Sequence, residues 1–121
     1  MNRPLETDPL AAVKADQSIA LRLHALAHPA RLAILRMLAC RDACCCKDVV
    51  AEVGLAQSTV SQHLRTLVEA GLVSYRPDRQ SSRYSLDRAA LGALARNVGS
   101  LLEVCCAEPD CCGEKAGEAP R

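Results

Sequence analysis

The chain has 121 residues, half of them hydrophobic, a formal net charge of +1, and no aromatic residues other than two tyrosines. A chain of this length forms one domain, and its core must be built from aliphatic side chains. The composition excludes an intrinsically disordered chain and a strongly basic nucleic-acid-binding tail, so any contact with DNA must depend on local clusters of positive charge.

The first residues, MNRPLETDPLAAVKADQ, carry acidic side chains and no long apolar run, so they do not resemble a signal peptide. We expect no membrane span either, because no uninterrupted apolar stretch approaches the length that a bilayer requires. These features predict a soluble, cytoplasmic protein. In that reducing compartment, the eight cysteines favour metal binding or redox chemistry over structural disulfides.

Four helices are predicted in the first part of the chain. Apolar residues recur at helical spacing over residues 10–27, and a second helix begins at Pro29, a residue suited to the first helical turn. A short third helix, CKDVVAEVG, ends at Gly54, and a fourth, STVSQHLRTLVEAG, ends at Gly71. Glycine takes the left-handed conformation of a helix end at low cost, so both glycines mark boundaries.

A hairpin and a last helix are predicted after Gly71. The stretch LVSYRPDRQSSRYSL alternates in character around a polar break at residues 77–80, which is typical of a β-hairpin. Asp87 is suited to cap the last helix, whose apolar stripe is formed by Leu91, Leu94, Val98, Leu101, Leu102 and Cys105. The predicted fold class is mainly α with a small β-hairpin.

The third and fourth helices, with the tight turn between them, predict a helix-turn-helix, and the hairpin makes it a winged version. Small and amide side chains suit base edges, whereas arginines on the hairpin suit phosphates. The predicted DNA contacts are Gln57, Ser58, Thr59, Ser61, Gln62, Arg65, Arg76, Arg79 and Arg83. His63 lies between the polar and apolar faces and is predicted to be a hydrogen-bonded packing residue.

The strings HPARLAIL and GLAQSTVSQHLRTLVEAGLV, followed by the hairpin, resemble the ArsR/SmtB family of bacterial metalloregulators over about residues 15–104. The most specific part is the pattern LxQxxVSxHLxxLxxAGLV, which begins at Leu55. The resemblance implies a homodimeric winged helix-turn-helix repressor, not an enzyme, that leaves double-stranded operator DNA when a metal or metalloid binds. The chain departs from the family at Ala56, where serine is frequent; an alanine cap costs about 1 kcal/mol unless Ser58 replaces it.

Three regions follow from this organisation. Residues 1–8 are predicted to be a flexible N-terminus, residues 9–106 a DNA-binding and dimerisation domain, and residues 107–121 a cysteine-containing acidic tail. The stripe on the last helix, together with Leu10 and Val13, is too apolar to face water in a monomer of this size, which favours a two-fold dimer.

The cysteines near the third helix fit the family poorly. The last helix contains no histidine, so the zinc site that some family members carry there is absent. Three cysteine positions that other members use at the third helix fall on Cys45, Lys47 and Val50, and a shift of one residue matches Cys44 and Cys46 but no third cysteine. Cys44, Cys45 and Cys46 therefore remain open between a second or vestigial metal site and a structural role.

The C-terminal cysteines fit better. Some arsenic sensors of the family bind As(III) with two adjacent cysteines at the end of the last helix and a third six residues later, a pattern that falls here on Cys105, Cys106 and Cys112, with Cys111 as an alternative third ligand. Three soft thiolates suit As(III) or Sb(III), and methylated As(III) is a further alternative effector. No catalytic cofactor is expected. Cys40 is predicted to be a buried packing residue.

Two other functions are alternatives to metalloid sensing. A persulfide or redox sensor of the same fold would join a cysteine of the second helix to one of the last helix. This chain has Arg36 where such family members carry that cysteine, although Cys40 could substitute. A small thiol enzyme ranks last, because the chain has no Cys-x-x-Cys motif in a βαβ setting.

Overall fold

Five helices and a two-stranded antiparallel sheet make up the part of the chain that the computed structural model describes, residues 9–80 and 82–109. The elements, all predicted from the sequence and in the predicted order, are α1 (Pro9–Leu26), α2 (Pro29–Ala39), α3 (Cys46–Val53), α4 (Gln57–Glu69), β1 (Val73–Arg76), β2 (Arg83–Leu86) and α5 (Arg88–Cys106).

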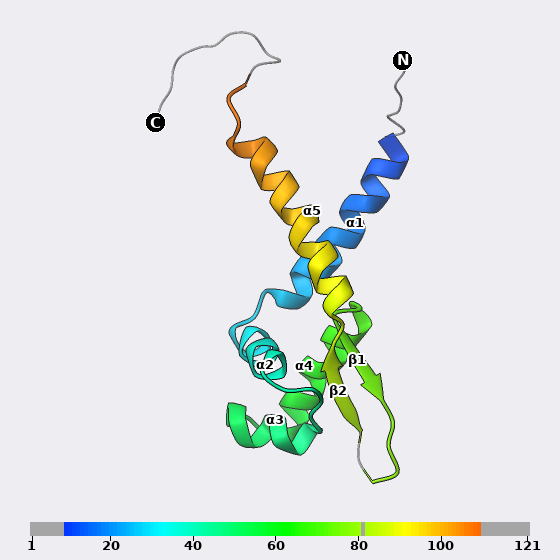
Figure 1. Ribbon diagram of the computed structural model, residues 1–121, viewed down its shortest axis with the longest axis vertical. Helices are drawn as coiled ribbons and strands as arrows, with labels where there is room; N and C mark the ends of the chain where they lie inside the picture. The colour runs from blue at the N-terminus through cyan, green and yellow to red at the C-terminus, as the bar shows by residue number, and fades with distance from the viewer. Residues whose placement is uncertain (1–8, 81, 110–121) are drawn as a thin grey trace.

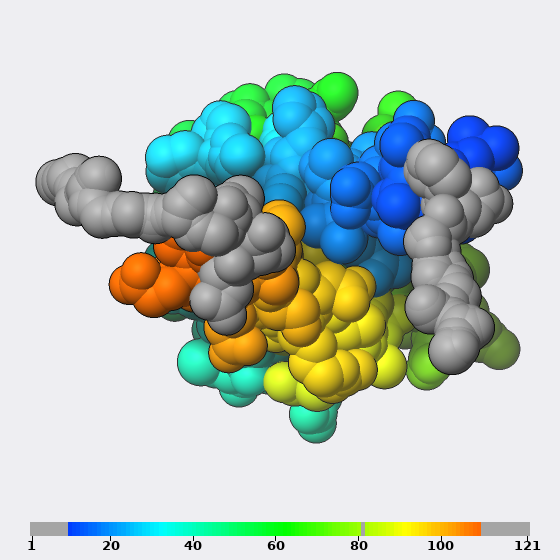
Figure 2. Space-filling view, turned by 90° about the horizontal axis from the view of Figure 1, so that it is seen from above, coloured from blue at the N-terminus to red at the C-terminus, as the bar shows by residue number. Residues whose placement is uncertain are grey.

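Two long helices cross at one end of a smaller cluster of elements. Figure 1 shows α1 and α5 crossing above α2, α3, α4 and the hairpin, with their outer ends diverging. Leu23 and Leu26 of α1 and Leu91 and Leu94 of α5 line one shared apolar hollow, so the two helices pack together at the crossing. Seen from above, α1 and α5 lie side by side over this end of the molecule (Figure 2).

The core lies beneath the helix-turn-helix. Its largest fully buried side chains come from α2, the connection between α2 and α3, α3, α4 and the residue before the hairpin, and they are Ile34, Leu38, Cys44, Val49, Val60, Leu64, Leu67 and Leu72. On α4 they recur at helical spacing, so this helix has one buried and one exposed face. The exposed face is held in place by the packing of the opposite one.

Local signals set the element boundaries where the sequence predicts them. Gly54 ends α3 with φ of 78°, and Gly71 follows α4 with φ of 81°, both in the left-handed region that favours glycine. The Asp87 carboxylate accepts a hydrogen bond from the Ala90 amide at 3.0 Å and so caps α5, as predicted.

A backbone bridge joins the connection between α2 and α3 to the hairpin. The Cys44 amide donates to the Tyr84 carbonyl at 2.9 Å, and the Tyr84 amide donates to the Cys44 carbonyl at 2.7 Å. The segment before α3 therefore lies along β2 as a short third strand would.

Helix α5 is long and apolar enough to span a membrane by length and composition, with 19 residues and a mean hydropathy of 1.3. As expected, it contains no uninterrupted apolar run of that length, because Arg88, Arg96 and Glu103 interrupt it. Length and composition do not distinguish a membrane helix from an interface helix, and a single such helix is weak evidence for a span.

Helix α4 starts without a side-chain cap. Ala56 occupies the N-cap position with φ of −61° and ψ of 148°, and it supplies no side-chain hydrogen bond. We expect Ala56→Ser to raise the free energy of unfolding by about 1 kcal/mol, because the serine hydroxyl can accept from a free amide of the first turn. Urea denaturation at a fixed protein concentration measures this.

Ala51→Ser, on the exposed middle of α3, is the matched control. It introduces the same hydroxyl where the backbone amides are already bonded within the helix, so it should not stabilise. Equal stability of the two variants would contradict the assignment of Ala56 as an uncompensated cap.

Candidate nucleic-acid interface and thiol sites

The polar face of α4 is exposed along the first half of the helix. All six side chains that the sequence predicts as helix contacts to DNA lie on the exposed side: Gln57, Ser58, Thr59, Ser61, Gln62 and Arg65. The opposite side is buried through Val60, Leu64 and Leu67. The helix therefore presents short hydroxyl and amide groups, which suit base edges, on a rigid support.

The hairpin adjoining α4 carries three exposed arginines. Arg76 and Arg83 are direct partners across the two strands, and Arg79 lies in the connection between them. Neither Arg76 nor Arg83 forms an ion pair with a carboxylate of the described residues, although Asp42 and Asp78 line the same hollow. Like charges directly opposite on a sheet repel each other, so this arrangement favours an anionic partner such as a phosphate.

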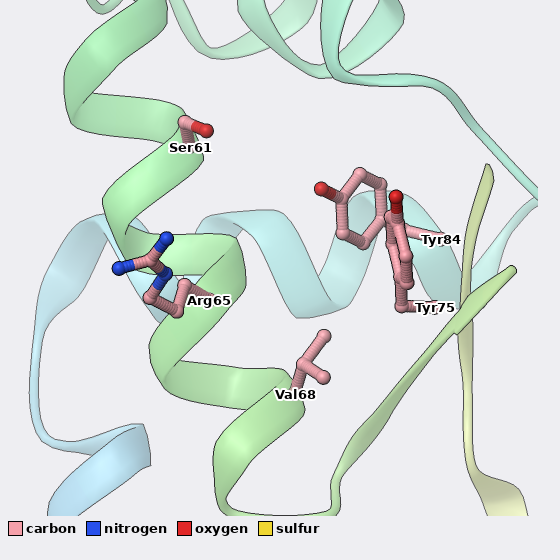
Figure 3. A pocket seen from close by; sticks show the side chains of 5 residues that line it. All are labelled: Ser61, Arg65, Val68, Tyr75 and Tyr84. Carbon is pink, nitrogen blue, oxygen red and sulfur yellow. The ribbon is translucent and has the colours of Figure 1, made fainter. Parts of the chain in front are cut away.

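A cavity of about 290 Å³ separates α4 from the hairpin. Figure 3 shows Ser61, Arg65 and Val68 on α4, with the rings of Tyr75 and Tyr84 side by side on the hairpin. The ring centroids are 5.4 Å apart, and the Tyr75 hydroxyl lies 2.9 Å from the Ser82 hydroxyl.

Sequence reasoning did not assign the tyrosine pair to the site. Tyr75 and Tyr84 are direct partners across the two strands, but they lie at unequal distances from the polar break at residues 77–80, so the sequence did not pair them. Burial raises the pKa of the Tyr84 hydroxyl, with smaller contributions in the same direction from Cys46 and Tyr75. This hydroxyl is therefore a neutral hydrogen-bonding group between helix and wing.

His63 is a packing residue, as predicted. It is buried, its Nδ1 accepts a hydrogen bond from Arg31 Nε at 3.2 Å, and its ring lies 4.5 Å from the ring of His28 between centroids. Burial lowers the pKa of His63, and the nearby His28 and Arg31 lower it further. The neutral imidazole thus joins α4 to α2 and to the turn before α2.

The three adjacent cysteines near α3 occupy different environments. Cys44 is fully buried in the core, and burial raises the pKa of its thiol. Cys45 and Cys46 are partly buried at the start of α3, and burial also raises the pKa of Cys46. Among the residues that the structure describes, no three His, Cys, Asp or Glu side chains converge on a point that could hold a metal ion.

The C-terminal thiols lie at the end of α5. Cys105 and Cys106 are both exposed, and α5 ends at Cys106. Cys111 and Cys112, the alternatives for the third ligand, lie outside the described residues. Cys40 corrects the sequence prediction: it is exposed, because it forms the C-cap of α2, where the chain leaves the core.

Comparison with known proteins matches residues 28–75 to the model of the bacterial regulatory protein, arsR family. An HTH-type transcriptional regulator of Mycobacterium tuberculosis is 39% identical over 97 residues, which cover 78% of this chain and 81% of the relative. The arsenical resistance operon repressor of Staphylococcus aureus is 34% identical over 76 residues, or 63% of this chain and 72% of the relative.

The solved structures include a homodimeric winged helix-turn-helix DNA-binding domain from Mycobacterium bovis, a possible ArsR-family transcriptional regulator. It is 29% identical with a TM-score of 0.61, over 81% of this chain and 91% of that domain. The chain belongs to the ArsR/SmtB family. Helices α3 and α4 and the adjoining hairpin are thus the helix-turn-helix and wing of an ArsR/SmtB transcriptional repressor, and the protein is not an enzyme.

Neutral His63 predicts a defined pH dependence of stability. Because its folded-state pKa is lowered from 6.5, the folded protein binds fewer protons than the unfolded protein near that pH. The stabilisation is fully present above pH 6.5 and is lost as the pH falls through the lowered folded-state pKa. We expect His63→Gln to lose less stability than the wild type between neutral and acidic pH, measured by urea denaturation.

His24→Gln is the control for this experiment, since His24 is an exposed histidine of α1. It should keep the wild-type pH dependence. If His24→Gln flattened the profile and His63→Gln did not, the assignment to the buried imidazole would be wrong.

Proposed function

We propose that the chain represses transcription as a homodimer on double-stranded operator DNA, and that As(III) or Sb(III) releases it by binding the thiolates of Cys105, Cys106 and Cys112. Methylated As(III) shares the same thiol chemistry. The observation that carries the proposal is an exposed thiol pair at the end of α5, whose outer half is itself an exposed apolar surface. Such a regulator acts in the cytoplasm and needs no membrane anchor.

The DNA contacts of this proposal divide between α4 and the hairpin. Gln57, Ser61 and Gln62 on the exposed face of α4 would read base edges, together with Ser58, Thr59 and Arg65. Arg76, Arg79 and Arg83 would bind phosphates and so position the helix without reading sequence. The hydroxyl and amide character of α4 supports this division, as do the hairpin arginines, for which no ion pair is found within residues 9–80 and 82–109.

The proposed dimer surface is the outer half of α1 and α5. Its large apolar side chains are exposed to 50–74% of their area, and they are Leu10, Val13, Leu101, Leu102 and Val104. Exposed apolar surface of this kind marks an interface, and the homodimeric relative from M. bovis supports a second copy as its occupant. A partner helix would also account for the apolar composition of α5.

The proposed effector site needs a third thiolate. Adjacent residues on a helix point about 100° apart, so Cys105 and Cys106 alone cannot surround an ion. Pro109 lies beyond the end of α5 and cannot continue a helix, which lets the chain return toward the pair. Cys112, or Cys111 in its place, would supply the third sulfur, and the name of the S. aureus relative supports an arsenical effector.

The proposed switch connects this site to the dimer. Cys105 follows Leu101 and Leu102 on the same helix, so a metalloid that draws the thiolates together acts directly on the interface. A ligand shifts an equilibrium only by its preference for one of the two states. Couplings of this kind are on the order of 1–3 kcal/mol, which is sufficient to release DNA.

The division of DNA contacts is tested with two substitutions. We expect Arg83→Gln to weaken binding to all DNA sequences and to reduce the slope of log affinity against log salt by about one unit, because one phosphate contact is lost. Gln62→Ala should relax sequence preference and leave the salt slope unchanged. Fluorescence anisotropy on matched and mismatched sites at several salt concentrations measures both. Equal effects of the two variants on specificity would contradict the division.

The effector site is tested by titrating the reduced, DNA-bound protein with As(III). We expect Cys105→Ser and Cys106→Ser to bind DNA but to lose the response, because two sulfurs cannot hold the ion firmly. Cys112→Ser should weaken the response, with Cys111 as a partial replacement. Cys40→Ser is the matched control, since Cys40 is also an exposed thiol at a helix end, and it should respond like the wild type.

Two results would overturn the effector proposal. The first is a response that survives loss of Cys105 and Cys106 but disappears when Cys44, Cys45 and Cys46 are replaced. The second is release of DNA by a sulfane-sulfur donor and not by As(III), which would favour the persulfide sensor.

A further inference from the structure

A groove beside α4 contains a second pair of thiols. It encloses about 520 Å³ and is lined by the start of α3, the first half of α4 and the hairpin, through Cys45, Cys46, Lys47, Gln57, Ser61, Gln80, Ser82 and Tyr84. This volume lies within the range of about 300–1,000 Å³ that is usual for small-molecule sites. Gln57 and Ser61 belong to the proposed DNA-reading face, so the groove opens on the side that DNA would occupy.

The backbone holds the two thiols in fixed positions in this groove. The bridge between Cys44 and Tyr84 anchors the preceding residue to the hairpin. The Cys45 amide donates to the Asp48 carboxylate at 3.3 Å, which fixes the start of α3. Cys44 is fully buried and does not line the groove, whereas Cys45 and Cys46 are partly exposed to it.

The lining of the groove favours covalent chemistry over metal binding. No third thiol, carboxylate or imidazole lines it beside the pair, and no metal-binding group of three was found among the described residues. The other lining side chains are hydroxyls, amides and one cation, Lys47. Such a surface suits a polar adduct that carries negative charge.

We propose that Cys45 is a modification site, at which thiol–disulfide exchange with a small anionic peptide disulfide places an adduct in the groove and blocks DNA binding. The Cys45 thiolate attacks one sulfur of the disulfide, whose S–S bond breaks as the new S–S bond to Cys45 forms. The second half of the reagent leaves as a thiolate and takes up a proton. Cys45 is oxidised and the leaving thiol is reduced, and an added thiol reverses the exchange.

Cys45 occupies the N-cap position of α3, where the positive end of the helix favours a negatively charged sulfur. Burial raises the pKa of the Cys46 thiol, so less of it is thiolate at neutral pH. The same effect acts on Cys44, which is also shielded by the core. Lys47 lines the same groove, so its ammonium group can pair with the carboxylates of an adduct there.

The adduct would act on DNA directly. It lies between Ser61 of α4 and Ser82 of the hairpin, in the gap that a DNA backbone would cross to reach both elements. It also brings negative charge to a surface that otherwise attracts phosphates. This inference rests on the DNA-contact surface proposed above, but it adds an input that is independent of the C-terminal thiols.

The test uses the full chain with Cys40, Cys105, Cys106, Cys111 and Cys112 replaced by Ser, so that the three cysteines near α3 remain. The reduced protein is treated with oxidised glutathione and examined by intact mass, peptide mapping and anisotropy on an operator fragment selected with the untreated protein. We expect one glutathionyl group on Cys45 and a Kd about tenfold higher or more, reversed by dithiothreitol. Adding Cys45→Ser should abolish both effects, and adding Cys46→Ser, the matched control, should preserve them.

Serine is a favoured N-cap residue, so Cys45→Ser should fold, and circular dichroism of each variant checks this. An adduct that leaves the Kd unchanged, modification confined to another cysteine, or loss of DNA binding that persists in Cys45→Ser would each overturn the proposal. Failure of the untreated protein to bind any DNA would instead count against the proposed DNA-contact surface. Mapping of the adduct would then still decide whether Cys45 is the reactive thiol.

Discussion

The pair of backbone hydrogen bonds between Cys44 and Tyr84 determines where the hairpin lies relative to the helices. A two-stranded hairpin is marginally stable alone in water, and the added bridge supplies the neighbour that it otherwise lacks. The Asp87 amide donates to the Leu72 carbonyl at 3.0 Å and closes the other end of the hairpin. Because α4 packs on the same core, these contacts set the gap between helix and wing, and the tyrosine cavity and the thiol groove both occupy that gap.

Two like charges of the hairpin lie directly opposite each other across the strands. The net charge of the whole chain is only +1, yet Arg76 and Arg83 face each other across the strands without a carboxylate ion pair in the described part of the chain. Cross-strand pairs change the stability of a sheet by about 0.2–1 kcal/mol, and two like charges directly opposite each other destabilise it. A phosphate between the strands would remove the repulsion. The local arrangement of charges therefore favours an anionic partner, although the net charge of the chain is small.

The elements were predictable because their signals are local. Pro29, Gly54, Gly71 and Asp87 act on their own turns, and the apolar stripe of α4 follows from its period. Burial of the cysteines was not predictable, because it depends on contacts between distant parts of the chain. Cys44 is buried where its backbone pairs with Tyr84, 40 positions away. Cys40 has apolar neighbours in sequence but is exposed at the end of a helix.

The candidate site also contains features that local sequence signals predict and features that depend on contacts between distant residues. The polar face of α4 and the hairpin arginines could be placed from spacing, and both sets of side chains are exposed in the structure. The tyrosine pair and the groove with Cys45 could not, because three separate elements form them. Of the proposed C-terminal ligands, Cys112 lies outside the described residues, so their grouping was proposed from the sequence pattern.

The two proposed thiol sites would control DNA binding with different limits. A metalloid at the end of α5 acts through the balance of two dimer states, so at saturation it reduces DNA affinity by no more than its preference between them, about 5- to 150-fold. An adduct on Cys45 acts by occupying the space that DNA needs, so the remaining binding follows the fraction of protein left unmodified. The first input therefore lowers DNA binding gradually as the effector concentration rises, and some DNA binding remains at saturation. The second removes individual molecules from the DNA until a thiol restores them.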